Sequence, residues 1–298
     1  EKVTLLAETG EYQIPLVMAI ALLCVGLAIK SALYPFHSWL PDAYGYSTIS
    51  SAAMLSSLVS KGYIFLVIKI IYRVIGFETF VDSKIINILF VFGVLGMIVG
   101  SLDAIRENDI MRMIAFSSVA QIGYIYMGFG LGTEAGMVAS VFHIFSHAAT
   151  KALLFIVAMG LRDVSGGSKA FIDLTGAGRR NVIAGIGFTI GGLSMVGIPT
   201  FSGFVSKLLF SQAAIQADGK MLITLIALAI STILNAIYFM KTIIRIYSPV
   251  ENEQPISFKI KNPVYVVSIV CFIVLNVVLG MWSTTIVSLI ESGLGMFR

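Results

Sequence analysis

The segment NVIAGIGFTIGGLSMVGIPTFSGFVSKLLFSQAAIQA, residues 181–217, is apolar over most of its length but is interrupted in the middle. As one straight helix it would be about 55 Å long, whereas the hydrocarbon core of a bilayer is about 30 Å thick. Pro199 lacks a backbone N–H, and Gly197 and Gly203 on either side of it permit unusual backbone angles. The sequence therefore predicts a broken membrane helix, whose unpaired backbone must face protein or a water-filled cavity.

The composition of the whole chain indicates a membrane protein. Of its 298 residues, 57% are hydrophobic and only 12% are charged, whereas soluble domains carry about 25% charged residues. The basic residues behind the net charge of +4 are scattered between apolar segments and form no basic block. We therefore expect a lipid bilayer around the chain and no nucleic acid as a partner.

Apolar runs of about 20 residues, the length that crosses a bilayer, occur about eight times in the chain. The expected spans are 13–34, 50–75, 85–105, 109–131, 134–160, 182–216, 219–246 and 264–290. A second interruption is expected in KSALYPFHSWLPDAYG, residues 30–45, where Pro35 and Pro41 flank an aromatic loop. We expect an all-α integral membrane fold with discontinuous helices, and the two breaks suggest an internal repeat of the kind found in transporters.

Four lysines, Lys30, Lys61, Lys151 and Lys207, lie within apolar segments. A charged lysine at the centre of a membrane helix costs about 2.5–3.5 kcal/mol. The acidic residues of the chain lie in loops or near the ends of the spans, so we expect none of them to pair with these lysines at depth. Because an amine without a counter-charge gives up its proton easily in a low dielectric, these lysines are candidates for loading and releasing protons.

Three protonatable groups recur at every fourth residue of HIFSHAATK, residues 143–151. His143, His147 and Lys151 fall on one helix face, with about 6 Å between successive positions. Histidine changes its charge near neutral pH, and one or two waters could bridge each step. The alternative that the histidines only join helices by hydrogen bonds stays open, although the other lysines favour a proton relay.

No residue pattern predicts a metal or a cofactor. Cys24 and Cys271 lie far apart in apolar runs and make neither a disulfide pattern nor a metal-ligand pattern. The spacing of His143 and His147 would suit zinc, but the segment lacks the glutamate of a metalloprotease helix and a third ligand nearby. We expect no catalytic residue in the chain itself.

The residues around the two breaks are expected to support them. These are Pro35, His37, Trp39 and Asp42 at the first break and Gly197, Pro199 and Gly203 at the second. An aromatic loop at a membrane interface often serves only as an anchor. Whether His37, Trp39 and Asp42 have a further function stays open at this point.

Four motifs resemble, in the same order, the signatures of the antiporter-like subunits of respiratory complex I, Mrp-type cation/proton antiporters and membrane-bound hydrogenases. They are KSALYPFHSWLPDAYGYSTISSAAMLSSLVSKGYIFLVIK (30–69), DIMRMIAFSSVAQIGYI (109–125), HIFSHAATKALLF (143–155) and GIPTFSGFVSKLLF (197–210). Together they cover nearly the whole chain, which makes the resemblance specific.

The resemblance implies a core of fourteen helices with two inverted five-helix repeats, each containing a discontinuous helix. The eight spans would then be the seventh to fourteenth helices of one transmembrane domain, residues 1–298. In that domain 12–75 would end the first repeat, 84–246 would form the second, and 264–290 would be the final helix. The family also carries a glutamate on its fifth helix that has no counterpart here, so we expect this chain to be the C-terminal part of a longer polypeptide.

Site roles follow from the same resemblance. Lys30 resembles the lysine of the first broken helix, Lys61 the lysine of the next helix, and Lys207 the ionisable residue of the second broken helix. The residues His143, His147 and Lys151 resemble the relay that connects them along a hydrated axis at the membrane midplane.

The expected function is that of a proton-translocating, antiporter-like subunit of a multisubunit complex in a bacterial or archaeal inner membrane. Its expected partners are other membrane subunits, and its expected ions are protons, with Na⁺ left open. Whether it serves a redox-driven translocase also stays open. Two alternatives remain: a freestanding secondary transporter of an organic solute, and a structural or quinone-binding subunit whose lysines only fix helix packing.

Overall fold

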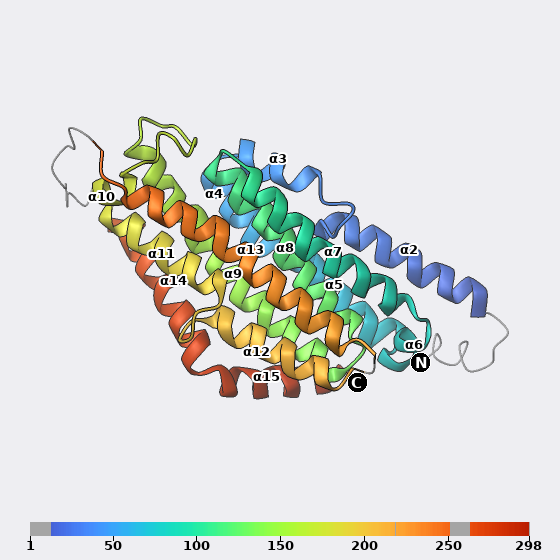
Figure 1. Ribbon diagram of the computed structural model, residues 1–298. Helices are drawn as coiled ribbons and strands as arrows, with labels where there is room; N and C mark the ends of the chain where they lie inside the picture. Colours follow the sequence, from blue (N-terminus) through green and yellow to red (C-terminus); the bar gives the residue numbers. More distant parts are fainter. Residues whose placement is uncertain (1–12, 218, 251–262, 298) are drawn as a thin grey trace.

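A bundle of α-helices makes up the computed structural model, which describes residues 13–217, 219–250 and 263–297 (Figure 1). Seven helical segments in these residues are long and apolar enough to cross a membrane. They are α2 (Gln13–Ser31), Ile49–Ile75, α7 (Ile85–Arg106), α8 (Ile110–Gly130), α9 (Glu134–Asp163), α13 (Met221–Tyr247) and α14 (Pro263–Met281). The expected all-α membrane fold is confirmed, while the expected domain's first residues, 1–12, lie outside the described residues.

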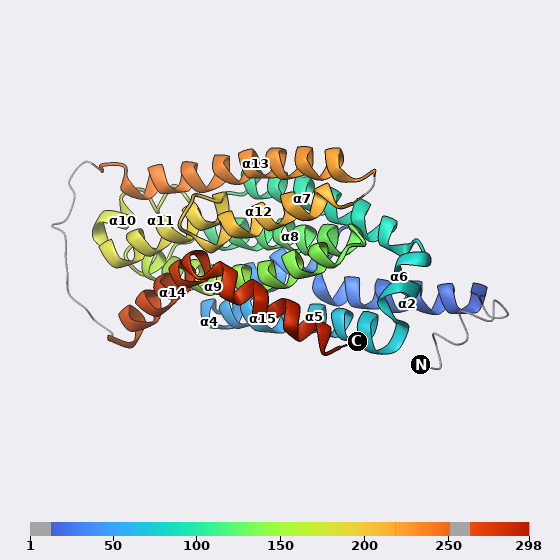
Figure 2. The same ribbon diagram turned by 90° about the horizontal axis from the view of Figure 1, so that it is seen from below.

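The helices α8 and α9 lie in the middle of the bundle, with α13 on one side and α14 and α5 (Ser60–Ile70) on the other (Figure 2). Nearly every side chain of α8 is buried. Where α8 crosses α7, a Cβ on Gly123 would lie 2.6 Å from the carbonyl oxygen of Gly93, so the two backbones are in contact. Small residues allow such close approach of membrane helices.

The eighth expected span, 182–216, is the broken helix that the sequence predicts. It consists of α11 (Val182–Val196) and α12 (Ser202–Ile215), each too short to cross a bilayer alone. Gly197 ends α11 at a φ of +91°, in the left-handed region that favours glycine. A Cβ on Gly203 would overlap the carbonyl oxygen of Ser194, so only glycine lets α12 begin this close to α11.

The first expected interruption is also present. The helix α2 ends at Ser31, and the chain turns through Pro35 before α3 (Trp39–Tyr46) begins. The expected span 50–75 then runs through α4 (Ile49–Met54) and α5, with π-helical turns η1 (Leu55–Val59) and η2 (Ile71–Ile75) after each of them. The sequence did not predict these two wide turns.

The last expected span, 264–290, differs from the structure. The helix α14 ends at Met281, and a second helix, α15 (Ser283–Gly295), begins after Trp282 in a new direction (Figure 1). A continuous apolar run does not reveal such a turn, because both helices present apolar residues. A Cβ on Gly280 would overlap the carbonyl oxygen of Thr200, so the end of α14 covers the break between α11 and α12.

Candidate functional site

The predicted ladder of protonatable groups lies on the central helix α9. The side chains of His143, His147 and Lys151 are all buried, and that of Lys151 is 0% exposed. The rings of His143 and His147 stack with their centroids 5.9 Å apart and their planes 11° apart. This spacing agrees with the helical geometry expected from the sequence, while the proton-carrying role stays a prediction.

The hydrogen bonds of the two histidines differ. His143 Nδ1 lies 2.5 Å from the hydroxyl of Ser206 on α12. His143 Nε2 and both ring nitrogens of His147 have no hydrogen-bond partner in the described part of the chain. The ladder therefore contains an imidazole that is buried but does not join helices by hydrogen bonds.

Two buried lysines, Lys61 and Lys151, and the half-buried Lys207 each donate to one backbone carbonyl and one hydroxyl. Lys61 on α5 donates to the carbonyl of Ser56 and to Ser60 Oγ, the latter at 3.2 Å. Lys151 donates to the carbonyl of Ile114 at 2.7 Å and to Ser117 Oγ. Lys207 on α12 donates to the carbonyl of Val196 at 2.6 Å and to Thr232 Oγ1 at 2.9 Å.

No salt bridge joins Lys61, Lys151 or Lys207 to a carboxylate of the described residues. The ion pairs between described residues join Arg106 to Asp103 and Arg112 to both Asp42 and Glu107. All of them lie near the ends of membrane helices, as the sequence predicted for the acidic residues. A buried lysine that has only neutral partners is costly to keep charged, which is the condition expected of a group that exchanges protons.

The structure does not place Lys30 among these lysines inside the bundle. It lies in the last turn of α2, at the edge of the bundle, with an exposed side chain (Figure 1). The sequence placed Lys30 within an apolar segment, but in the structure its side chain is exposed. Its part in a proton pathway stays a prediction.

The residues of the first break connect it to neighbouring helices. Trp39 Nε1 donates to the carbonyl oxygen of Ile29 at 3.0 Å, which ties α3 back to α2. Asp42 pairs with Arg112 at the start of α8. His37 stacks on Tyr34, and burial lowers the pKa of its imidazole below the usual value. No contact between described residues joins His37, Trp39 or Asp42 to the buried lysines.

A polar cluster that was not predicted from the sequence surrounds the second break. Asn276 Oδ1 on α14 accepts from the hydroxyls of Thr150, Ser194 and Ser202 at 2.7, 3.0 and 3.1 Å. The hydroxyl of Ser146 donates to Ser202 at 2.7 Å. These contacts fasten α9, α11, α12 and α14 together, and the signal in the sequence is a single asparagine within the apolar run VCFIVLNVVLG.

Tyr124 on α8 is a second residue of the site that was not predicted. Its ring stacks on His143 with centroids 5.3 Å apart, and its hydroxyl has no hydrogen-bond partner in the described part of the chain. Residues 117, 121 and 124 recur at helical spacing, so Ser117, Gln121 and Tyr124 share one face of α8. This polar face within a buried helix was the available signal.

Comparison with known proteins agrees with this geometry. Residues 1–234 match the family model described as "NADH:quinone oxidoreductase/Mrp antiporter, TM". The chain belongs to this family. It is 32% identical over 234 residues to the NADH-quinone oxidoreductase subunit N of Desulforudis audaxviator (strain MP104C), which covers 78% of this chain and 45% of that protein.

Two further relatives come from other complexes. One Na(+)/H(+) antiporter subunit of Alkalihalophilus pseudofirmus is 34% identical over 216 residues, covering 67% of this chain and 26% of that protein. One chain of the membrane-bound sulfane sulfur reductase, an archaeal respiratory membrane complex, superposes with a TM-score of 0.82 and 27% identity, covering 93% of this chain and 55% of that one. The chain thus spans less than two thirds of each relative's length, and the family resemblance expected from the four motifs is confirmed.

Proposed function

We propose that this chain is the proton-conducting part of an antiporter-like subunit in a multisubunit membrane complex. Lys61, His143, His147, Lys151 and Lys207 pass protons along the middle of the bundle, with water bridging the steps. The observation that carries this proposal is a set of three lysines with only neutral hydrogen-bond partners among the described residues. Lys61 and Lys151 are buried and Lys207 is half-buried. Beside them, the imidazole of His147 has no hydrogen-bond partner in the same part of the chain.

The hydroxyl beside each lysine supports a reversible proton load. When the amine is protonated, the hydroxyls of Ser60, Ser117 and Thr232 accept its hydrogen bonds. When the amine is neutral, the same hydroxyl rotates and donates to the nitrogen lone pair, because a hydroxyl is both donor and acceptor. A carboxylate would instead hold the lysine in its charged form.

Repulsion between like charges couples the neighbouring groups of this row, which consists of Lys61, His143, His147, Lys151 and Lys207. Two neighbouring groups of the row resist being charged together, because charges at short distance in a low dielectric repel strongly. A proton arriving at one lysine therefore favours release from the next. Lys30 is proposed to act before Lys61, because its motif position resembles that of the lysine in the family's first broken helix.

Partners and ions are proposed from the relatives. The compared proteins are subunits of a quinone oxidoreductase, of a Na(+)/H(+) antiporter and of a respiratory membrane complex. We therefore propose other membrane subunits as partners and a bacterial or archaeal membrane as the location. Protons are the ion that a row of lysines carries directly, whereas Na⁺ would need a set of oxygen ligands.

The test is proton pumping by the complete complex after reconstitution into liposomes. Lys151→Ala and Lys207→Ala are expected to abolish pumping while the driving reaction of the complex continues. Lys69→Ala is the matched control, since Lys69 is an exposed lysine at the end of α5. Unchanged pumping by both Lys151→Ala and Lys207→Ala would show that the lysines only fix packing. Uptake of an organic solute by the isolated full-length protein would support the freestanding transporter.

A further inference from the structure

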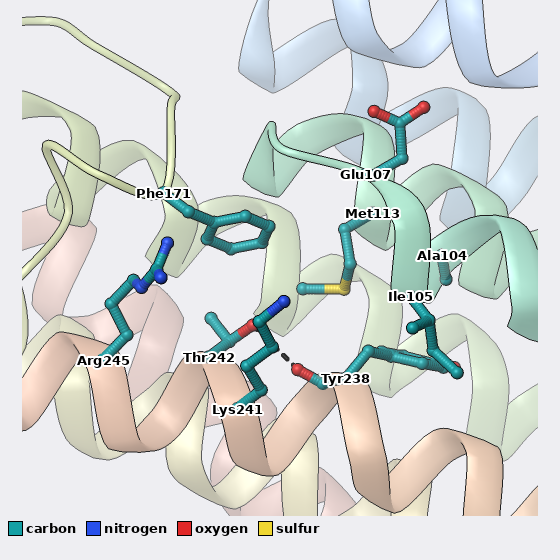
Figure 3. Close-up of a pocket in the computed structure, with 9 residues that line it drawn as sticks. All are labelled: Ala104, Ile105, Glu107, Met113, Phe171, Tyr238, Lys241, Thr242 and Arg245. Atoms are coloured by element: carbon teal, nitrogen blue, oxygen red, sulfur yellow. Dashed lines mark hydrogen bonds between the residues drawn. The ribbon is translucent and has the colours of Figure 1, made fainter.

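Two cations, Lys241 and Arg245, line a pocket near the C-terminal end of α13 (Figure 3). They are four residues apart on one face of the helix, so their side chains start about 6 Å from each other. The Lys241 side chain is exposed, and its amine is directed into the pocket (Figure 3). The guanidinium carbon of Arg245 lies over the ring of Phe171, 5.9 Å from the ring centroid. Both cations therefore belong to one site at the protein surface.

No salt bridge joins either cation to a carboxylate of the described residues. Glu107 also lines the pocket, but its carboxylate is directed away from Lys241 (Figure 3) and pairs with Arg112 at 3.0 Å. A guanidinium stacked on a ring, like that of Arg245, keeps the N–H groups at its edge available to an anion. The site thus offers two positive charges to an anion from outside the described chain.

An apolar face of α13 leads up to this site. Its exposed side chains recur every three or four positions, as on a helix side that meets lipid, and are those of Ile226, Ile230, Ile233 and Ile237. From Ile230 to Lys241 the helix rises by about 16 Å, which is close to half of the hydrocarbon thickness of a bilayer, about 30 Å. An acyl chain that lies along this face would therefore place its headgroup at the two cations.

The end of the bundle that holds this site is rich in basic residues. The helix α7 ends at Arg106, α8 begins near Arg112, and α9 ends beside Arg162. The loop after α9 is joined to α13 at this end, since the Gly176 N–H donates to the carbonyl oxygen of Arg245 at 3.2 Å. Short loops rich in Lys and Arg face the cytoplasm. The cytoplasmic leaflet contains anionic lipids, and basic pockets between membrane helices on that side bind their headgroups.

We propose that Lys241 and Arg245 bind the phosphate group of one anionic phospholipid of the cytoplasmic leaflet, whose acyl chains lie along the exposed face of α13. The phosphate oxygens accept hydrogen bonds from the amine and from the edge of the guanidinium. A lipid suits the site better than a free phosphate ion does, because the apolar face beside the cations matches acyl chains. The binding of this lipid does not depend on the proton-carrying role of the buried lysines.

The site is tested by photocrosslinking in the complete complex, within phosphatidylcholine vesicles that contain a small fraction of radiolabelled phosphatidylglycerol. Ile244 is replaced by the photoreactive residue benzoylphenylalanine, because its side chain is 64% exposed and lies one turn from Lys241. The subunit is expected to take up at least about tenfold more label from phosphatidylglycerol than from radiolabelled phosphatidylcholine at the same mole fraction. Unlabelled phosphatidylglycerol should compete with the label, whereas inorganic phosphate should not.

Removal of the two charges tests whether they cause this preference. Lys241→Gln combined with Arg245→Gln is expected to abolish the preference for phosphatidylglycerol at position 244. The matched control is Lys69→Gln combined with Lys84→Gln, which also removes two exposed lysines but none on α13, and should leave the labelling unchanged. Lys241→Gln alone should lower the preference several-fold, and it keeps the test valid if the double variant does not assemble.

Three results would overturn the inference. The first is an unchanged preference in the charge-removal variants, or no preference in the wild-type site. The second is competition by inorganic phosphate, which would assign the site to a free phosphate ion. The third is crosslinking of position 244 to another subunit instead of lipid, which would show that a protein covers this face of α13. Proton pumping tests the proposed function separately, because neither Lys241 nor Arg245 belongs to the row of proton-carrying groups.

Discussion

Lys207 donates a hydrogen bond to the carbonyl oxygen of Val196 at 2.6 Å, across the break between α12 and α11. Val196 is the last residue of α11, so this carbonyl belongs to the negative end of the helix dipole. The break therefore gives an ammonium group at membrane depth a favourable site without a carboxylate. Lys61 also donates to a backbone carbonyl, that of Ser56, which lies in the π-helical turn η1 within a continuous helix.

Gly197→Ala is expected to destabilise the protein by about 1–3 kcal/mol, because alanine is strained at a φ of +91°. Its Cβ would also lie 3.0 Å from Lys207 Cδ and push the lysine from its site. Thermal unfolding in detergent measures the effect. Gly62→Ala is the control: Gly62 lies within α5 with nothing within 4 Å of an added Cβ, and the change should be neutral or stabilising.

His147→Phe distinguishes a relay from a structural histidine. Since neither ring nitrogen has a hydrogen-bond partner in the described residues, an apolar ring of similar size should leave the unfolding temperature unchanged or raise it. Proton pumping should fall by about tenfold or more, as expected when a proton-transfer group is lost. A loss of stability with normal pumping would contradict the relay. Phe145→Leu, on the exposed side of the same helix, serves as control.

Asn276→Leu is expected to cost about 1–3 kcal/mol, because the hydroxyls of Thr150, Ser194 and Ser202 lose their shared acceptor. The helix pairs that meet at the second break would then loosen first. Unfolding in detergent measures the loss, and protease sensitivity between α11 and α12 locates it. Ser268→Ala, on the exposed side of α14, should be within experimental error of wild type.

Asp42→Asn removes the ion pair between α3 and Arg112. Asp42 is exposed, so the expected loss is below about 1 kcal/mol and shrinks further at high salt. Arg112→Ala should cost more, because Arg112 also pairs with Glu107 at 3.0 Å and lies over the ring of Phe116. Stability measured at low and high salt checks both expectations. Equal losses for the two variants would show that the Asp42 pair is the dominant contact.

The sequence alone determined the membrane fold and the two helix breaks. Span length follows from bilayer thickness, and Pro199 with its flanking glycines cannot continue a helix. Periodicity also placed His143, His147 and Lys151 on one face, since a helix fixes which residues share a face whatever surrounds it. All of these features depend on local geometry, so they can be predicted from the sequence.

Tertiary structure decided which groups meet across helices. Other helices supply partners for two of the lysines, as Ile114 does for Lys151 and Thr232 does for Lys207. The exposure of Lys30, the convergence of three hydroxyls on Asn276 and the approach of α13 to Ser117 depend on helix packing. Spacing within one helix carries no information about its neighbours, because the same polar face can turn toward any of several helices.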